Sequence, residues 1–152
     1  MLTKWQPKRS KFKRLHKGVI KKCQYRLSTK FVQQGYAGLR VLKSGRFTPK
    51  QLEQSRRKLL VVKKKKEKQR IWFKCVPDVP ITCKALGLRM GKGKGAIKYW
   101  SARLLAGKIM VQINHMTRRR SFKALSLIRK ILPVPTKVVP NRLLIYTKLK
   151  TH

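Results

Sequence analysis

The sequence predicts an α+β fold in which a mixed or antiparallel sheet is flanked by two helices. Helical signals occur near residues 48–66 and 121–132, and stretches rich in β-branched and aromatic residues lie around them without a regular strand–helix alternation. A length of 152 residues with 41% hydrophobic residues suits one domain with a modest core and appendages. We therefore assign residues 1–30 to an extended basic N-terminal arm and residues 31–152 to a single α+β domain.

The arm is basic throughout, has no acidic residue between positions 4 and 30, and shows no sustained helical or strand period. Trp5, Phe12 and Tyr25 are interleaved with its charges, and such aromatic side chains either stack on nucleobases or anchor the arm to its own domain. We expect the arm to contact nucleic acid. The cations of the arm include Lys8, Arg9, Lys11, Lys13, Arg14 and Lys17, and His16 is the one histidine that we expect to take part in binding.

The first elements of the domain are a short strand around residues 39–42 and a helix that begins after Thr48. Pro49 suits the first helical position, and Gln51 completes a capping box with Thr48. The side that faces a core carries Leu52, Ser55, Leu59 and Val62. Arg56 and Arg57 lie on the remaining surface, which we expect to face phosphate because acidic partners for its charges are scarce.

Three further strands are expected in the middle of the chain. Residues 71–76 have strand composition and are closed by Pro77 and Pro80. Residues 97–104 and 108–114 are separated by a turn that contains Gly107, so they predict an antiparallel hairpin. Trp72 and Phe73 form one adjacent aromatic pair on these strands, and Tyr99 and Trp100 form another. One member of each pair should pack in the core and the other should face outward.

The second helix is predicted to start at the cap residue Ser121 and to stop before Pro133. Its core side carries Phe122, Leu125, Ile128 and Leu132. Three consecutive cations, Arg118, Arg119 and Arg120, precede it and oppose the helix dipole, a conflict that a bound phosphate would relieve. Residues 137–148 should form a final strand pair, or an edge strand with a break at Pro140.

Glycines alternate with lysines in the most unusual segment, which consists of Arg89, Met90, Gly91, Lys92, Gly93, Lys94 and Gly95. Glycine lets a backbone approach a phosphate closely and adopt positive φ, while each lysine supplies a charge. The relaxed dinucleotide fingerprint is satisfied in form only, because the acidic residue expected about 20 positions later is absent. We expect this loop to touch a phosphodiester backbone.

The formal net charge of +39, from 42 Lys and Arg against three acidic residues, requires a polyanionic partner to offset self-repulsion. Catalysis finds little support, since the three acids and three histidines are scattered singly, and neither a metal nor a cofactor is expected. The three cysteines form no Cys-x-x-Cys pair and are expected to be free thiols. No apolar stretch is long enough for a membrane span or a signal peptide.

Several motifs occur together in one order over about positions 6–135. They are the run from Gln6 to Gly18, then Gly45-Arg46-Phe47-Thr48, Ile71-Trp72, Pro77-Asp78, Pro80-Ile81-Thr82, the segment from Arg89 to Gly95, Tyr99-Trp100 and Gly107-Lys108. In these motifs the chain resembles the universal large-subunit ribosomal protein family that is called L-sixteen in bacteria.

The resemblance implies a structural constituent of the large ribosomal subunit that binds large-subunit rRNA near the aminoacyl-tRNA path and supports translation and subunit assembly without catalysis. It implies that Lys8, Arg9, Lys11, Lys13, Arg14, His16 and Lys17 thread rRNA. It also implies that Arg89, Lys92 and Lys94 lie near rRNA, with tRNA and neighbouring ribosomal proteins as further partners. A free-standing RNA chaperone or maturation factor is the alternative, since it would share the same charge pattern.

The chain also departs from the bacterial members of this family. Residues 19–36 match poorly, Cys83 and Lys98 stand where acids are common, and Arg118 to Arg120 stand where Pro and Glu are usual. These departures, together with the absence of a presequence, predict a mitochondrial member made inside the organelle. The expected location is the large subunit of the mitochondrial ribosome, with a bacterial or plastid ribosome as the alternative.

Overall fold

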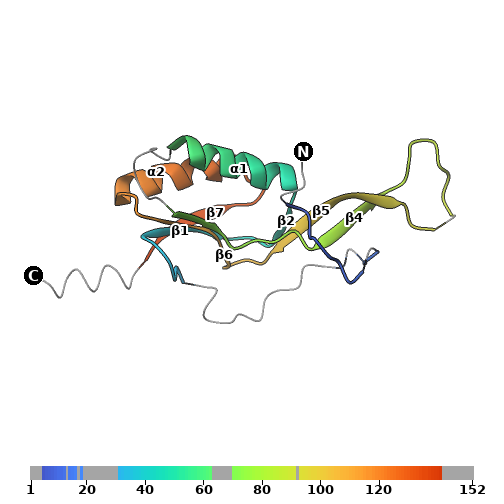
Figure 1. Ribbon diagram of the computed structural model, residues 1–152, viewed down its shortest axis with the longest axis horizontal. Helices are drawn as coiled ribbons and strands as arrows, with labels where there is room; N and C mark the ends of the chain where they lie inside the picture. The colour runs from blue at the N-terminus through green and yellow to red at the C-terminus, as the bar shows by residue number, and fades with distance from the viewer. Residues whose placement is uncertain are drawn as a thin grey trace, which may run out of the picture.

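The computed structural model describes residues 5–12, 14–16, 18, 31–62, 70–91 and 93–141, and it has the predicted α+β fold (Figure 1). Lys13, Lys17 and Lys92 lie outside these residues, as do most of segment 19–36 and all but the first residues of the predicted strand at 137–148. The elements follow the chain in the order β1 (Ala37–Val41), β2 (Gly45–Phe47), α1 (Pro49–Val62), β3 (Arg70–Phe73), β4 (Val79–Cys83), β5 (Ala96–Leu104), β6 (Ile109–Asn114), α2 (Arg118–Arg129) and β7 (Thr136–Pro140).

The strands form two antiparallel sheets. The larger sheet has the order β3-β6-β1-β7 and the smaller one the order β2-β5-β4. Both helices lie on the same side of the larger sheet, whereas β4 and β5 extend away from the body and end in a long loop (Figure 1). The loop is therefore displayed at a distance from the core.

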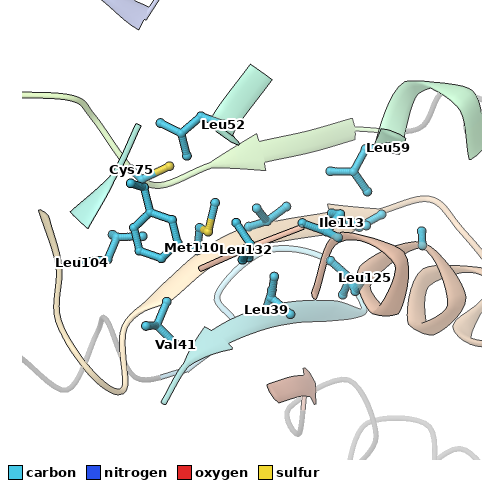
Figure 2. Close-up of a cluster of buried hydrophobic side chains, with 14 of the residues drawn as sticks. Leu39, Val41, Leu52, Leu59, Cys75, Leu104, Met110, Ile113, Leu125 and Leu132 are labelled. Carbon is cyan, nitrogen blue, oxygen red and sulfur yellow. The ribbon is translucent and has the colours of Figure 1, made fainter. Parts of the chain in front are cut away.

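The core lies between the helices and the larger sheet (Figure 2). Ala37, Leu39 and Val41 alternate along β1 and are fully buried, because successive side chains of a strand point to opposite faces. Leu52 and Leu59 of α1 and Leu125 and Ile128 of α2 cover them, as their spacing predicts.

The start of α1 confirms the predicted capping box. The backbone N–H of Thr48 donates to Oε1 of Gln51 at 2.9 Å, and the N–H of Gln51 donates to Oγ1 of Thr48 at 3.4 Å. Ser55, buried on the core side, donates its hydroxyl to the carbonyl of Gln51 at 2.8 Å, so its polar group is satisfied inside the helix. These contacts are local, which is why the sequence predicts them residue by residue.

The predicted hairpin between residues 97–104 and 108–114 is wrong in its pairing. Both strands exist, but β5 pairs with β2 and β4, while β6 pairs with β1 and β3. The N–H of Gly107 donates to the carbonyl of Val41 at 2.6 Å and the N–H of Val41 donates to the carbonyl of Lys108 at 3.0 Å, so β1 occupies the place that β5 would take. The turn between β5 and β6 therefore connects a strand of the smaller sheet to a strand of the larger sheet.

The segment around Pro77 and Pro80 also differs from the prediction. The strand expected at 71–76 ends at Phe73, and a further strand, β4, contains Pro80. Proline is tolerated there because β4 is an edge strand that pairs with β5 alone. The three-residue strand β2 was not predicted, since so short a run carries no alternating pattern.

The second helix starts four residues earlier than predicted. Thr117 is its N-cap residue and makes no side-chain capping bond, and Arg118 is its first residue. Ser121 is not the cap: it is fully buried and donates its hydroxyl to the carbonyl of Met116 at 3.3 Å. The final strand β7 lies at an edge of the larger sheet as far as the described residues extend, and it ends at Pro140. Residues 142–148 lie outside the described residues, so the choice between a strand pair and an edge strand stays a prediction.

Candidate nucleic-acid interface

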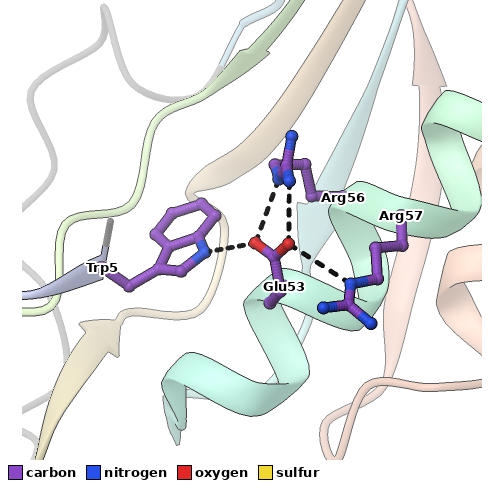
Figure 3. A network of polar contacts seen from close by, with 4 residues as sticks. All are labelled: Trp5, Glu53, Arg56 and Arg57. Atoms are coloured by element: carbon purple, nitrogen blue, oxygen red, sulfur yellow. Dashed lines mark hydrogen bonds and ion pairs between the residues drawn. The ribbon is translucent and has the colours of Figure 1, made fainter. Parts of the chain in front are cut away.

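Trp5 anchors the start of the basic arm to the domain (Figure 3). Its indole Nε1 donates to Oε2 of Glu53 at 2.8 Å, and its ring meets that of Phe73 edge to face with centroids 5.5 Å apart. Of the two roles open to the arm aromatics, Trp5 therefore takes the anchoring one. Phe12 is 54% exposed with the ammonium of Lys11 5.5 Å from its ring, so it remains available at the surface.

Glu53 is the acceptor on which this anchor depends. Nε of Arg56 donates to its Oε2 at 3.0 Å, Nη2 donates to its Oε1 at 2.8 Å, and Arg57 reaches Oε1 at 3.4 Å. These contacts, led by the hydrogen bond from Arg56, lower the pKa of Glu53 from 4.5 to about 2. In turn, the carboxylate raises the pKa of Arg56. Arg56 thus positions the arm, whereas Arg57, whose side chain is 76% exposed, presents its charge to solvent.

The lowered pKa predicts how stability depends on pH. Because the folded pKa lies below the unfolded value, Glu53 stabilises the fold above about pH 4.5, and that contribution is lost as the pH falls toward 2. We expect Glu53→Gln to lower the free energy of unfolding by about 2 kcal/mol at pH 7, and to have almost no effect near pH 2. Urea unfolding of both proteins across this range measures the difference.

A matched control is Asp78→Asn. The carboxylate of Asp78 is 3.8 Å from Arg103 and both side chains are about half exposed, so this pair should contribute less than about 0.5 kcal/mol at any pH. Equal losses for the two variants at pH 7, or a Glu53→Gln loss that does not shrink in acid, would contradict the role given to Glu53.

The far end of the described arm lies beside the Gly/Lys-rich loop and β2. Nζ of Lys94 donates to the backbone carbonyl of Leu15, and Nη2 of Arg46 donates to the carbonyl of Gly18 at 2.5 Å. The arm and the loop were predicted as separate contacts, and the structure joins them across 79 positions of sequence. The arm residues assigned to binding whose side chains are described are all exposed: Lys8, Arg9, Lys11, Arg14 and His16.

The loop is shaped by its own lysine and glycines. Nζ of Lys84 donates to the carbonyls of Arg89 and Gly91, at 3.4 and 2.6 Å. Gly91 and Gly93 have φ values of +91° and +80°, a backbone region that favours glycine. The loop residues assigned to binding are described except for Lys92, and Arg89, Met90 and Lys94 are exposed.

At the base of the loop, Gly95 is required for a different reason. A Cβ at this position would meet the backbone carbonyl carbon of Cys83 at 2.7 Å and the nitrogen of Lys84 at 2.8 Å. The backbone at Gly95 can therefore lie close to the backbone of Cys83 and Lys84, where the loop leaves β4 and β5.

Arg118, Arg119 and Arg120 form a separate exposed group. They occupy the first turn of α2 and do not precede it, so their charges oppose the helix dipole from within the helix. The first turn contains no acidic residue. The guanidinium of Arg118 lies 5.9 Å from the ring centroid of Phe122, which holds it along the helix surface.

Metal binding and membrane insertion have no support in the part of the chain that the structure describes. That part holds no group of three or more metal-ligating side chains, and none of its helices is long and apolar enough to cross a membrane. Cys75 and Cys83 are free thiols there; burial raises the pKa of Cys75 to about 12, which leaves it an unreactive core residue.

Comparison with known proteins identifies the family. The family model for ribosomal protein L16p/L10e matches residues 7–139, which includes the arm, the loop and both helices. The chain belongs to the ribosomal protein L16p/L10e family. It is 39% identical over 139 residues to the large ribosomal subunit protein uL16 of Psychrobacter arcticus, an alignment that covers 91% of this chain and 98% of that relative.

Further relatives in the L16p/L10e family show similar identity and coverage. The uL16 protein of Cereibacter sphaeroides is 38% identical over 137 residues, and that of Buchnera aphidicola is 38% identical over 134 residues; each alignment covers 88% of this chain and 95% of the relative. Membership of this family confirms the predicted function as a structural component of the large ribosomal subunit, and shows that the chain is not an enzyme. The relatives named here are bacterial.

Proposed function

We propose that this L16p/L10e protein holds large-subunit rRNA with one continuous surface made by its arm and its Gly/Lys-rich loop. The observation that carries the proposal is the junction of these two segments at Lys94 and Leu15. Exposed cations lie on both sides of the junction, and no acidic residue occurs in the described parts of either segment. Such a surface suits phosphate neutralisation, which supplies most of the affinity of proteins for nucleic acids.

The anchored arm favours a resident ribosomal protein over an RNA chaperone. A chaperone has to release its RNA and gains from mobile contacts that do not depend on sequence. Here Trp5, Lys94 and Arg46 attach the arm to the domain at both ends of its described part, so the arm presents its cations from a defined position. Preorganisation of this kind lowers the entropy lost on binding one fixed partner.

The finer parts of the proposal concern location and partners. We place the protein in the large subunit of the mitochondrial ribosome because Cys83, Lys98 and Arg118 to Arg120 depart from the pattern typical of bacterial members. We place the loop beside the aminoacyl-tRNA path, with tRNA as a second partner, because the loop lies at the end of the strands β4 and β5, which extend away from the core. Neighbouring ribosomal proteins complete the set of partners.

Sedimentation tests residence and compartment together. Tagged protein from an organelle-enriched lysate is run on sucrose gradients at moderate and high salt. We expect it to remain with large subunits and whole ribosomes after the salt wash, and the rRNA in those fractions identifies the compartment. Migration with pre-subunits alone, or release to the top of the gradient, would favour the maturation factor. Residence on bacterial or plastid ribosomes would overturn the mitochondrial assignment alone.

Reversal of one charge on the loop tests the tRNA-proximal contact. We expect Arg89→Glu to slow subunit maturation or tRNA accommodation several-fold while the urea midpoint of the free protein changes little, since an exposed loop residue contributes little to the core. Lys98→Glu is the matched control, an equal charge change at an exposed position of β5. Equal defects in the two variants would count against a specific role for the loop.

A further inference from the structure

No helix in the described part of the chain packs on one face of the larger sheet. Both helices pack on the face that carries Ala37, Leu39 and Val41 (Figure 1). The strand registers identify the residues of the opposite face, since side chains that pair across an antiparallel ladder lie on the same side. One row across the sheet consists of Trp72, Gln112, Gly38 and Val139, and beside it lie the pairs Arg40–Lys137 and Arg70–Asn114. We name this the open face.

The charge of the open face has one sign. Arg70 on β3 and Lys137 on β7 are exposed at its two edges, and Arg40 is half-buried between them. The four strands β1, β3, β6 and β7 contain no acidic residue at all. Ordinary solvated surfaces mix both signs, so a one-sign surface at both edges of a sheet indicates an anionic partner.

Aromatic side chains accompany these cations. Trp72 is half-buried, and it alternates with Phe73, which packs against the core on the other face. Tyr36, which precedes β1 and alternates with the buried Ala37, is 39% exposed, and Phe31 is 50% exposed. A sheet that combines exposed aromatic rings with cations offers a surface on which nucleobases stack while their phosphates are neutralised.

The middle of the open face is closed by residues 31–34. Val32 is 3% exposed and fills the space above Gly38, where a Cβ would lie 2.9 Å from its methyl group. The N–H of Gln34 donates to Oε1 of Gln112 at 3.3 Å, and Nζ of Lys74 donates to Oε1 of Gln33 at 2.7 Å. Phe31 is the residue before Val32 in this crossing segment, and Arg70 and Lys137 remain exposed at the two edges of the sheet.

We propose that the open face is a second RNA-binding surface, separate from the arm and the loop. It takes a single-stranded or looped segment of rRNA, with phosphates at Arg70 and Lys137 and bases against Trp72, Tyr36 and Phe31. This inference rests on the proposed function, because it assumes that the RNA partner is rRNA. An opposing protein surface is the competing occupant, and charge complementarity favours RNA.

Photo-crosslinking inside assembled subunits tests the inference. Arg70→p-benzoylphenylalanine and Lys137→p-benzoylphenylalanine place a reactive group at each edge of the open face, and the same change at Arg129 and Lys130 places it on exposed positions at the C-terminal end of α2, where no RNA contact is assigned. We expect rRNA crosslinks from positions 70 and 137, and several-fold fewer from positions 129 and 130. Crosslinks from positions 70 and 137 to protein, or to nothing, would overturn the inference.

A charge-reversal pair gives an independent measurement. We expect Arg70→Glu with Lys137→Glu to weaken binding to deproteinised large-subunit rRNA by at least tenfold, and to lower the slope of log K against log salt by about 1.4 to 1.8. Arg129→Glu with Lys130→Glu, at exposed positions to which no RNA contact is assigned, is the control with the same net charge. Equal losses for the two pairs would overturn the inference. Failure of the unaltered chain to join subunits would instead overturn the proposed function, so the two failures are distinguishable.

Discussion

Replacing Gly35 by alanine is expected to destabilise the fold more than any other single methyl addition in the described chain. Gly35 has φ of +82°, and a Cβ there would lie 2.6 Å from the carbonyl carbon of Ile113 and inside contact distance of its oxygen. That oxygen accepts the N–H of Tyr36 at 3.0 Å, at the point where β1 meets β6 in the middle of the larger sheet. Backbone strain and a backbone clash act together, so we expect a loss of more than about 3 kcal/mol, measured by urea unfolding.

Gly87→Ala separates the two causes. Gly87 has φ of +84°, close to that of Gly35, but no atom lies within 4 Å of its Cβ position. This control should lose about 1 kcal/mol or less, since only local strain in an exposed loop is introduced. If Gly35→Ala loses no more than Gly87→Ala, the approach of residue 35 to Ile113 is not the constraint described.

The parts of the fold that the sequence predicts are those with local causes. The capping box of Thr48 and Gln51 joins residues three apart, and it locates the start of α1 without knowledge of the rest of the chain. Strand pairing is not local in this sense. The pattern of residues 97–104 and 108–114 identifies two strands but not their neighbours, and β1, over 60 positions earlier, takes the place beside β6.

Two predictions are wrong because proline and serine can each occupy more than one kind of structural position. Pro80 suggests a break, yet an edge strand tolerates proline where its missing N–H would face no partner. Ser121 suggests a cap, yet its hydroxyl is satisfied inside the core by the carbonyl of Met116. Which role applies depends on tertiary neighbours that no short window of sequence contains.

In the candidate site, too, the features with local causes can be predicted from the sequence and those that depend on long-range contacts cannot. Exposure of the arm cations and of the loop follows from composition and glycine spacing, which are properties of the sequence. The junction of Lys94 with Leu15 and the anchor of Trp5 on Glu53 are long-range contacts that no spacing rule predicts. One signal was present: Glu53 stands three and four residues before Arg56 and Arg57, a spacing at which helix side chains pair. It indicates that Arg56 holds a carboxylate before it can hold a phosphate.

Neutralising three arm cations is expected to give the largest loss of RNA affinity among the variants considered. Arg9→Gln, Lys11→Gln and Arg14→Gln together remove three exposed charges from the arm. Each phosphate contact contributes about 0.7 to 0.9 to the slope of log K against log salt, so the slope should fall by about 2 to 3. Near physiological salt this corresponds to roughly a hundredfold weaker binding to large-subunit rRNA. Filter binding over a series of salt concentrations measures both quantities.

The control removes the same charge from positions to which no RNA contact is assigned. Lys43→Gln, Arg129→Gln and Lys130→Gln change exposed residues after β1 and at the C-terminal end of α2, so the net charge changes equally while the arm stays intact. If RNA were attracted only by the total charge of the chain, the two triple variants would bind alike. A loss specific to the arm, with Trp5 still anchored on Glu53 and the urea midpoint unchanged, would show that the position of the cations, and not their number alone, determines binding.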